Sequence, residues 1–170
     1  MTDQIFGLSG ISPSDIKKVS IPPIPTRLEA LTHNKVDAAV LPDPLASLAE
    51  KQGAKVIFDD TTSDVNLSQT VILFSEKAVT ENKDAVKKIL KVYEAAGLLL
   101  TNTPDNYRTL AFEKARIPKP IQQTYKLPVF STLALPTQEE YNRIMDWMVS
   151  KKLLEKPYAF NELVDESLIK

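Results

Sequence analysis

Apolar and polar residues follow one another in short blocks between residues 16 and 60, and most blocks end at a Pro or a Gly. Three extended apolar patterns occupy residues 16–21, 36–41 and 54–58. The middle one, VDAAVL, is almost wholly apolar, which is typical of a strand that helices cover on both faces. Apolar residues at helical spacing lie between these patterns. The order predicted is therefore strand, helix, strand, helix, strand.

The residues that punctuate these blocks fit this order. Thr26 is predicted to cap a helix that carries Leu28 and Leu31 on one face. Pro44 suits the first turn of a second helix over residues 45–52, and Gly53 suits its end. Strands and helices that alternate with short connections predict an α/β fold, a mostly parallel sheet with helices on both faces.

A helical pattern dominates the rest of the chain. Residues 69–74 (QTVILF) read as a further strand, and Thr80 is predicted to cap a long amphipathic helix behind them. A second helix is expected from Pro104 to Ala115, and the capping-box pattern from Thr137 to Glu140 predicts a third. The predicted division is an α/β part over residues 1–68 and a mainly helical part over residues 69–170.

Composition excludes several function classes. The 170 residues are 43% apolar and 25% charged, with a formal net charge of −1, which argues against nucleic acid and anionic membrane surfaces as partners. The chain has no Cys and one His, so we expect neither a thiolate nor a His-ligated metal site, and no cofactor. No GxSxG sequence is present. We expect a protein that is not an enzyme.

Two turns at the ends of predicted strands are candidates for ligand binding, because ligands of open α/β sheets bind there. In the first turn, formed by Pro23, Ile24, Thr26 and Arg27, the Thr26 hydroxyl and the Arg27 guanidinium can bind a carboxylate, sulfonate or phosphate. The alternative is that Thr26 is only a helix cap and Arg27 a solvated charge. Pro25 removes one N–H donor from this turn.

The second turn consists of Leu41, Pro42 and Asp43. Asp43 can accept hydrogen bonds from an amine or a hydroxyl of a ligand. It can equally cap the helix that follows, and this second interpretation is the favoured one.

Several of these segments together resemble a known family. Pro22-Pro23 after a strand, Ala30-Leu31 in a helix, the run VDAAV at 36–40 and the run GAKVI at 53–57 occur in the order and spacing of that family. The chain resembles the second lobe of type 2 periplasmic solute-binding proteins of ABC importers, in the NMT1/THI5-like branch for nitrate, sulfonates, taurine and thiamine precursors. The resemblance implies that the first strand of this lobe is missing and that residues 69–170 cross the hinge into the first lobe.

The resemblance carries functional expectations. A small solute would bind in a cleft between two lobes, Ser68 and Gln69 would face that cleft beside the hinge, and an ABC permease would read the closed form. The full-length parent would be extracytoplasmic. Since residues 1–12 lack a signal-peptide pattern, the signal and the first lobe are expected upstream of Met1. The exposed sheet edge or the helical tail is expected to cause self-association.

Two other functions share this fold class. An effector-sensing domain of a cytoplasmic transcription regulator would require an adjoining helix-turn-helix, and these residues contain no such pattern. A thiamine-pyrimidine synthase-like enzyme has a Cys-rich segment as its hallmark, and this chain has no Cys.

Overall fold

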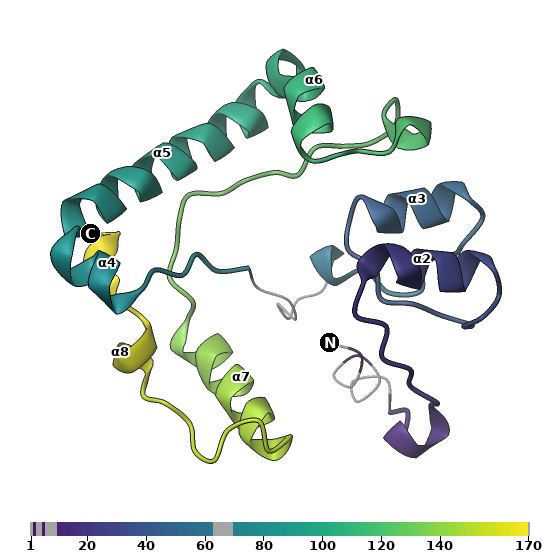
Figure 1. Cartoon of the computed structure of the whole chain (residues 1–170), viewed down its shortest axis with the longest axis horizontal. Helices are drawn as coiled ribbons and strands as arrows, with labels where there is room; N and C mark the ends of the chain where they lie inside the picture. Colours follow the sequence, from purple (N-terminus) through teal and green to yellow (C-terminus); the bar gives the residue numbers. More distant parts are fainter. Residues whose placement is uncertain (1, 3–4, 6–9, 63–69, 170) are drawn as a thin grey trace. The chain divides into compact units, whose positions relative to one another are not determined.

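The computed structural model describes residues 2, 5, 10–62 and 70–169 (Figure 1). The chain forms two compact units. The first contains Met1–Thr70 and Tyr107–Lys126, and the second contains Val71–Asn106 and Leu127–Lys170. Their assignment to two lobes of a binding protein remains a prediction.

The first unit is built from short helices. Its elements are η1 (Pro13–Asp15), α2 (Ile24–Thr32), α3 (Leu45–Lys51), η2 (Asp60–Thr62), most of α6 (Pro104–Lys114) and η3 (Lys119–Ile121). Helix α3 packs against α2 and against η3. The buried apolar side chains of this unit are Leu28, Ala49, Ile117, Ile121 and Tyr125. These side chains form a small core where α2, α3 and η3 meet.

The predicted parallel sheet is wrong for the part of the chain that the structure describes, because no strand occurs there. Residues 16–21, 38–41 and 54–58 are extended segments without a ladder of hydrogen bonds, and so are residues 70–74. An apolar pattern specifies an extended segment, but a strand also needs a neighbour for its backbone groups. Two of the carbonyls, those of Ile21 and Val40, instead accept hydrogen bonds from the Arg27 side chain.

The second unit is organised by a long helix. It contains α4 (Glu76–Glu81), α5 (Lys83–Asn102), α7 (Gln138–Ser150), α8 (Phe160–Leu163) and η4 (Glu166–Leu168). Helix α5 packs against α4 and η4. Its predicted apolar face is buried only in part, at Val86 and Leu90, whereas Ile89 and Tyr93 are exposed. No helix among the described residues has the length and apolar character that a bilayer crossing requires.

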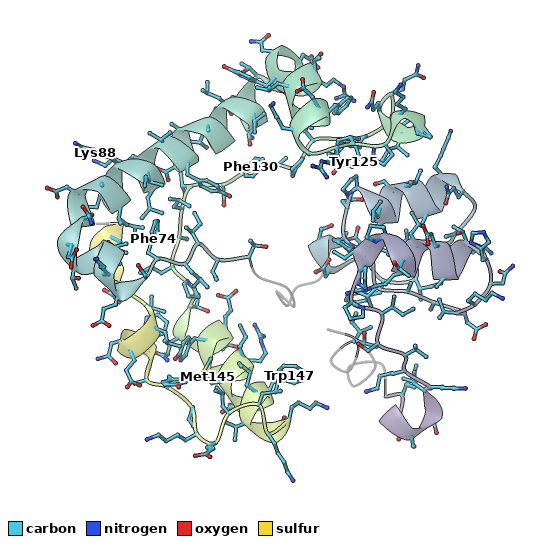
Figure 2. All side chains as sticks on the ribbon, in the orientation of Figure 1. Phe74, Lys88, Tyr125, Phe130, Met145 and Trp147 are labelled. Atoms are coloured by element: carbon cyan, nitrogen blue, oxygen red, sulfur yellow. The ribbon has the colours of Figure 1, made fainter. Side chains whose placement is uncertain are left out.

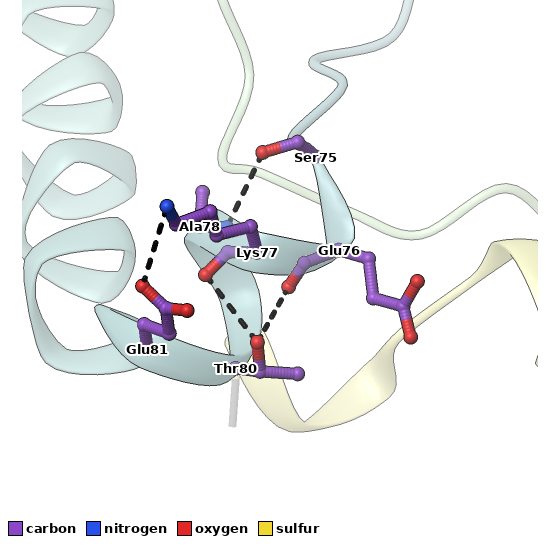
Figure 3. A network of polar contacts seen from close by, with 6 residues as sticks. All are labelled: Ser75, Glu76, Lys77, Ala78, Thr80 and Glu81. Atoms are coloured by element: carbon purple, nitrogen blue, oxygen red, sulfur yellow. Dashed lines mark hydrogen bonds and ion pairs between the residues drawn. The ribbon is translucent and has the colours of Figure 1, made fainter.

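The start of α5 differs from the prediction. Ser75 is the N-cap of a separate short helix, α4, and its hydroxyl accepts a hydrogen bond from the Ala78 N–H at 3.2 Å (Figure 3). Thr80 lies inside α4 and donates from its hydroxyl to the Glu76 carbonyl at 3.0 Å. Thr80 is therefore not a cap. Helix α5 begins at Lys83, and Asn82 is its N-cap residue.

The capping box of α7 is confirmed. The Thr137 hydroxyl accepts from the Glu140 N–H at 3.2 Å, and the Glu140 carboxylate accepts from the Thr137 N–H at 2.9 Å. Tyr141 then ties the C-terminal tail to α7, since its hydroxyl lies 3.0 Å from the Tyr158 carbonyl and its ring packs edge-on against Phe160. The predicted helix from Pro104 is also confirmed as α6, ending at Lys114.

An extended segment, residues 127–136, runs beside α5, and Figure 2 labels its Phe130. The Thr101 hydroxyl accepts from the Phe130 N–H at 2.8 Å and donates to the Phe130 carbonyl at 3.2 Å. The Glu94 carboxylate accepts from the Leu133 N–H at 2.9 Å. Gly97 makes this approach possible, because a Cβ at that position would lie 3.0 Å from Phe130 Cβ.

Helices α2 and α3 both end in a Schellman motif. Gly53, with φ of +100°, follows the last turn of α3, and the Ala54 N–H donates back to the Ala49 carbonyl at 3.0 Å. Asn34, with φ of +53°, plays the same part for α2. The prediction that Gly53 ends its helix is confirmed.

Candidate ligand-binding site

The side chain of Arg27 joins the two turns that the sequence singled out. Its Nε donates to the Ile21 carbonyl at 2.6 Å, its Nη2 to the Pro22 carbonyl at 3.2 Å and its Nη1 to the Val40 carbonyl at 3.2 Å. The first two carbonyls precede the Pro23 turn, and the third precedes Leu41. Arg27 therefore positions both turns, with its N–H groups donating to the backbone of this chain.

The first turn has a different local structure from the prediction. Helix α2 begins at Ile24, directly after its N-cap residue Pro23, which has no side-chain hydrogen bond to offer. Thr26 lies within the first turn of the helix. The prediction that Thr26 is the cap is therefore wrong. Thr26 and Pro23 are exposed, and Ile24 is half-buried. Their contact with a ligand remains a prediction.

Asp43, in the second turn, lies one residue before Pro44, the N-cap of α3, and its carboxylate accepts hydrogen bonds from the first turn of that helix. Its Oδ1 accepts from the Ser47 N–H at 3.0 Å and from the Ser47 hydroxyl at 2.7 Å. Leu41 is half-buried and Pro42 is exposed beside it. Ser68 and Gln69 lie outside the described residues.

Asp43 also borders a groove of about 540 Å³ within the first unit. Helix α3 forms one wall, and η3 with the residues after it forms the other. The lining residues are Asp43, Ser47, Glu50, Lys51, Ile121, Thr124, Tyr125 and Lys126. Two carboxylates, two ammonium groups and three hydroxyls thus border one space, and the buried Ile121 side chain also lines it.

Tyr125 is the aromatic residue of this groove, and Figure 2 labels it. Burial raises the pKa of its phenol, and the negative charge of Asp43 raises that pKa further. The phenol is therefore neutral at physiological pH and can donate a hydrogen bond to a ligand.

Arg108 holds the wall that carries Tyr125. Its Nη2 donates to the Tyr125 carbonyl at 2.7 Å and to the Gln122 carbonyl at 3.1 Å. Its guanidinium lies 4.7 Å from the centre of the Phe112 ring, and that ring packs edge-on against Tyr125. These contacts hold Tyr125 and the residues next to it in place.

Most of this groove was missed by reasoning from the sequence. Thr124, Tyr125 and Lys126 follow a short turn and carry no motif, and they reach α3 only through packing between segments about 75 residues apart. No local signal could have placed Tyr125 near Asp43.

The groove is suited to binding and carries no recognisable catalytic arrangement. Among the described residues, no group of His, Asp and Glu side chains could hold a metal ion. His33 ends α2, where its Nδ1 lies 2.8 Å from the Glu29 carbonyl. Charges of both signs and hydroxyls that line one shallow groove define the chain as a candidate small-solute-binding protein.

Comparison with known proteins identifies a family for the chain. The model of the NMT1-like family matches residues 4–112, and the chain belongs to this family. Membership indicates a solute-binding protein and is consistent with a protein that is not an enzyme. No curated protein and no solved structure matches the chain.

Proposed function

We propose that this chain binds a small solute for an ABC importer and that the groove bordered by Asp43 and Tyr125 contacts the solute. Family membership supports the class of function. The single observation that carries the site is the mixed lining, in which Asp43 and Glu50 face the same space as Lys51 and Lys126. The partner would be an ABC permease, and the working compartment extracytoplasmic.

The lining favours one kind of solute among nitrate, sulfonates and thiamine precursors. A solute that carries both an ammonium and an anionic group can satisfy both signs of charge, whereas nitrate leaves the carboxylates without a partner. The Tyr125 hydroxyl adds a donor for a sulfonate or carboxylate oxygen. An aminosulfonate such as taurine is therefore the solute class that we propose.

Thermal unfolding with matched solutes tests this proposal. A solute that binds only the folded chain raises the unfolding midpoint with the logarithm of its concentration. Taurine should raise the midpoint in this way, and ethanesulfonate, which lacks the amine, should need about tenfold higher concentration for the same rise. Nitrate and an aminopyrimidine complete the panel. Equal shifts with taurine and ethanesulfonate would contradict a role for the carboxylates.

Two variants separate binding from folding. Asp43→Asn keeps an oxygen for Ser47 and removes the charge, so it should weaken taurine and leave ethanesulfonate unchanged. Lys126→Gln should weaken both solutes. Lys17→Gln, in the exposed segment before α2, is the matched control and should change neither. Unchanged taurine binding in both groove variants would remove the groove from the proposal.

A further inference from the structure

Residues 55–59, with the sequence Lys-Val-Ile-Phe-Asp, form an exposed extended segment of the first unit. The relative exposures are 56% for Val56, 88% for Ile57 and 41% for Phe58. In extended backbone, Val56 and Phe58 share one face and Ile57 lies on the other, so both faces of the segment expose large apolar side chains. The segment follows the end of α3 and precedes η2, so both of its ends are held by helices.

The backbone of this segment is equally exposed to pairing. Within the part of the chain that the structure describes, the N–H and C=O groups of Lys55, Val56, Ile57 and Phe58 have no hydrogen-bond partner. An extended, apolar segment with open backbone groups is a template for strand addition.

The charges at its ends determine which partner fits. If two copies of the segment pair antiparallel about Ile57, Lys55 of one copy lies opposite Asp59 of the other, and Val56 lies opposite Phe58. The pairing is isologous, so the Lys–Asp contact forms twice. A parallel pairing in register would instead place Lys55 against Lys55 and Asp59 against Asp59.

Two hydrogen bonds from Thr61 orient the Asp59 carboxylate. Its Oδ1 accepts from the Thr61 N–H at 2.9 Å and from the Thr61 hydroxyl at 2.7 Å. Both of these bonds fall on one oxygen. They lower the pKa of the carboxyl, so Asp59 is ionised at neutral pH.

We propose that the chain forms a symmetric homodimer in which residues 55–59 of two copies pair as an antiparallel two-stranded ribbon. The dimer is distinct from solute binding, because none of residues 55–59 lines the groove. It also differs from the sheet predicted within the chain, since here the strands come from two copies. The short pairing makes a small interface, so the dimer should be weak and dependent on concentration.

Charge exchange provides the test. By sedimentation velocity at increasing concentration, Lys55→Asp and Asp59→Lys should each dimerise on the order of tenfold more weakly, because like charges then face each other twice. An equimolar mixture of the two variants should form a heterodimer at least as tightly as the wild-type homodimer, since every pair is again of opposite sign. This recovery also shows that both variants are folded.

Apolar substitutions supply a second readout. Ile57→Thr keeps the β-branched shape and should weaken the dimer, whereas Val19→Thr, in another exposed extended segment, should not. A monomer at several hundred micromolar would overturn the proposal. So would dimers that are insensitive to all these changes, or variants that fail to associate when mixed. Equal weakening by Ile57→Thr and Val19→Thr would indicate nonspecific apolar association instead.

Discussion

Arg27 Nη1 donates a hydrogen bond to the Val40 carbonyl at 3.2 Å, across thirteen residues of sequence. The same guanidinium also holds the carbonyls of Ile21 and Pro22. One side chain thereby fixes the ends of two extended segments that have no backbone ladder between them. The fork of N–H groups on a guanidinium is suited to this bridging, whereas a lysine ammonium cannot reproduce it.

Replacing Arg27 by Lys should therefore destabilise the first unit although the charge is kept. Each charge-assisted hydrogen bond contributes about 1.5–3 kcal/mol, and partial replacement by the ammonium leaves an expected loss of about 2 kcal/mol. Urea unfolding followed by circular dichroism measures this loss. Arg116→Lys, at an exposed turn, is the matched control and should cost less than about 0.5 kcal/mol. Equal stability of the two variants would show that the Arg27 bridge adds nothing.

The bridge also explains how far the sequence could predict the fold. The apolar patterns at residues 16–21, 36–41 and 54–58 predicted strands, and the structure has no strand at these residues. They could not show whether neighbouring segments pair, because pairing depends on partners distant in sequence. The Arg27 side chain was noted as a candidate for an anion, but the carbonyls that it binds are visible only in the folded chain.

The starts of the helices could be predicted where the residues next to the cap specify it, and could not where another capping residue lies upstream. Two threonines, Thr80 and Thr137, were each predicted to be caps. Thr137 has Glu140 three residues later, and this local pair is sufficient to specify the capping box. Thr80 was misassigned because Ser75, five residues earlier, caps α4 first. A second capping residue upstream was the signal that could have corrected this prediction.

Alanine substitutions should separate these two threonines. Thr137→Ala removes the cap of α7 and should cost about 1 kcal/mol in the free energy of unfolding. Thr80→Ala should be neutral or stabilise by a few tenths of a kcal/mol, because Thr80 lies inside a helix, where Ala is preferred. Ser75→Ala should resemble Thr137→Ala. A larger cost at Thr80 than at Ser75 would contradict the observed start of α4.

The coupling of Tyr125 to Asp43 predicts a pH effect. The pKa of the phenol is raised in the folded chain, first by burial and then by the Asp43 charge, so the folded state retains the proton more strongly than the unfolded state. The contribution of the Tyr125 phenol to the free energy of unfolding is therefore fully present below about pH 10, and it is lost as the pH rises through the raised pKa. Asp43→Asn should lower the pKa of the phenol.

Ultraviolet titration measures this change directly. The ionisation of Tyr125 is obtained as the difference at 295 nm between the protein and its Tyr125→Phe variant, each with and without Asp43→Asn. Asp105→Asn, in the first turn of α6, is the control and should leave the midpoint unchanged. If Asp43→Asn raised the pKa of Tyr125 or left it unaltered, the charge of Asp43 would not act on the groove.

Gly97 and Phe130 give the sharpest test of the second unit. In an isolated helix, Gly97→Ala would stabilise by about 1 kcal/mol. Here the added Cβ would lie 3.0 Å from Phe130 Cβ and 3.2 Å from Phe130 Cγ, so the ring and its backbone must move away from Thr101. Overpacking of this kind costs about 1–3 kcal/mol, and we expect a net loss of about 1 kcal/mol.

The sign should reverse in a Phe130→Ala background, where the helix preference acts alone. Urea unfolding of the four chains of this double-mutant cycle gives the coupling. Stabilisation by Gly97→Ala in both backgrounds would mean that residues 127–136 do not pack on α5.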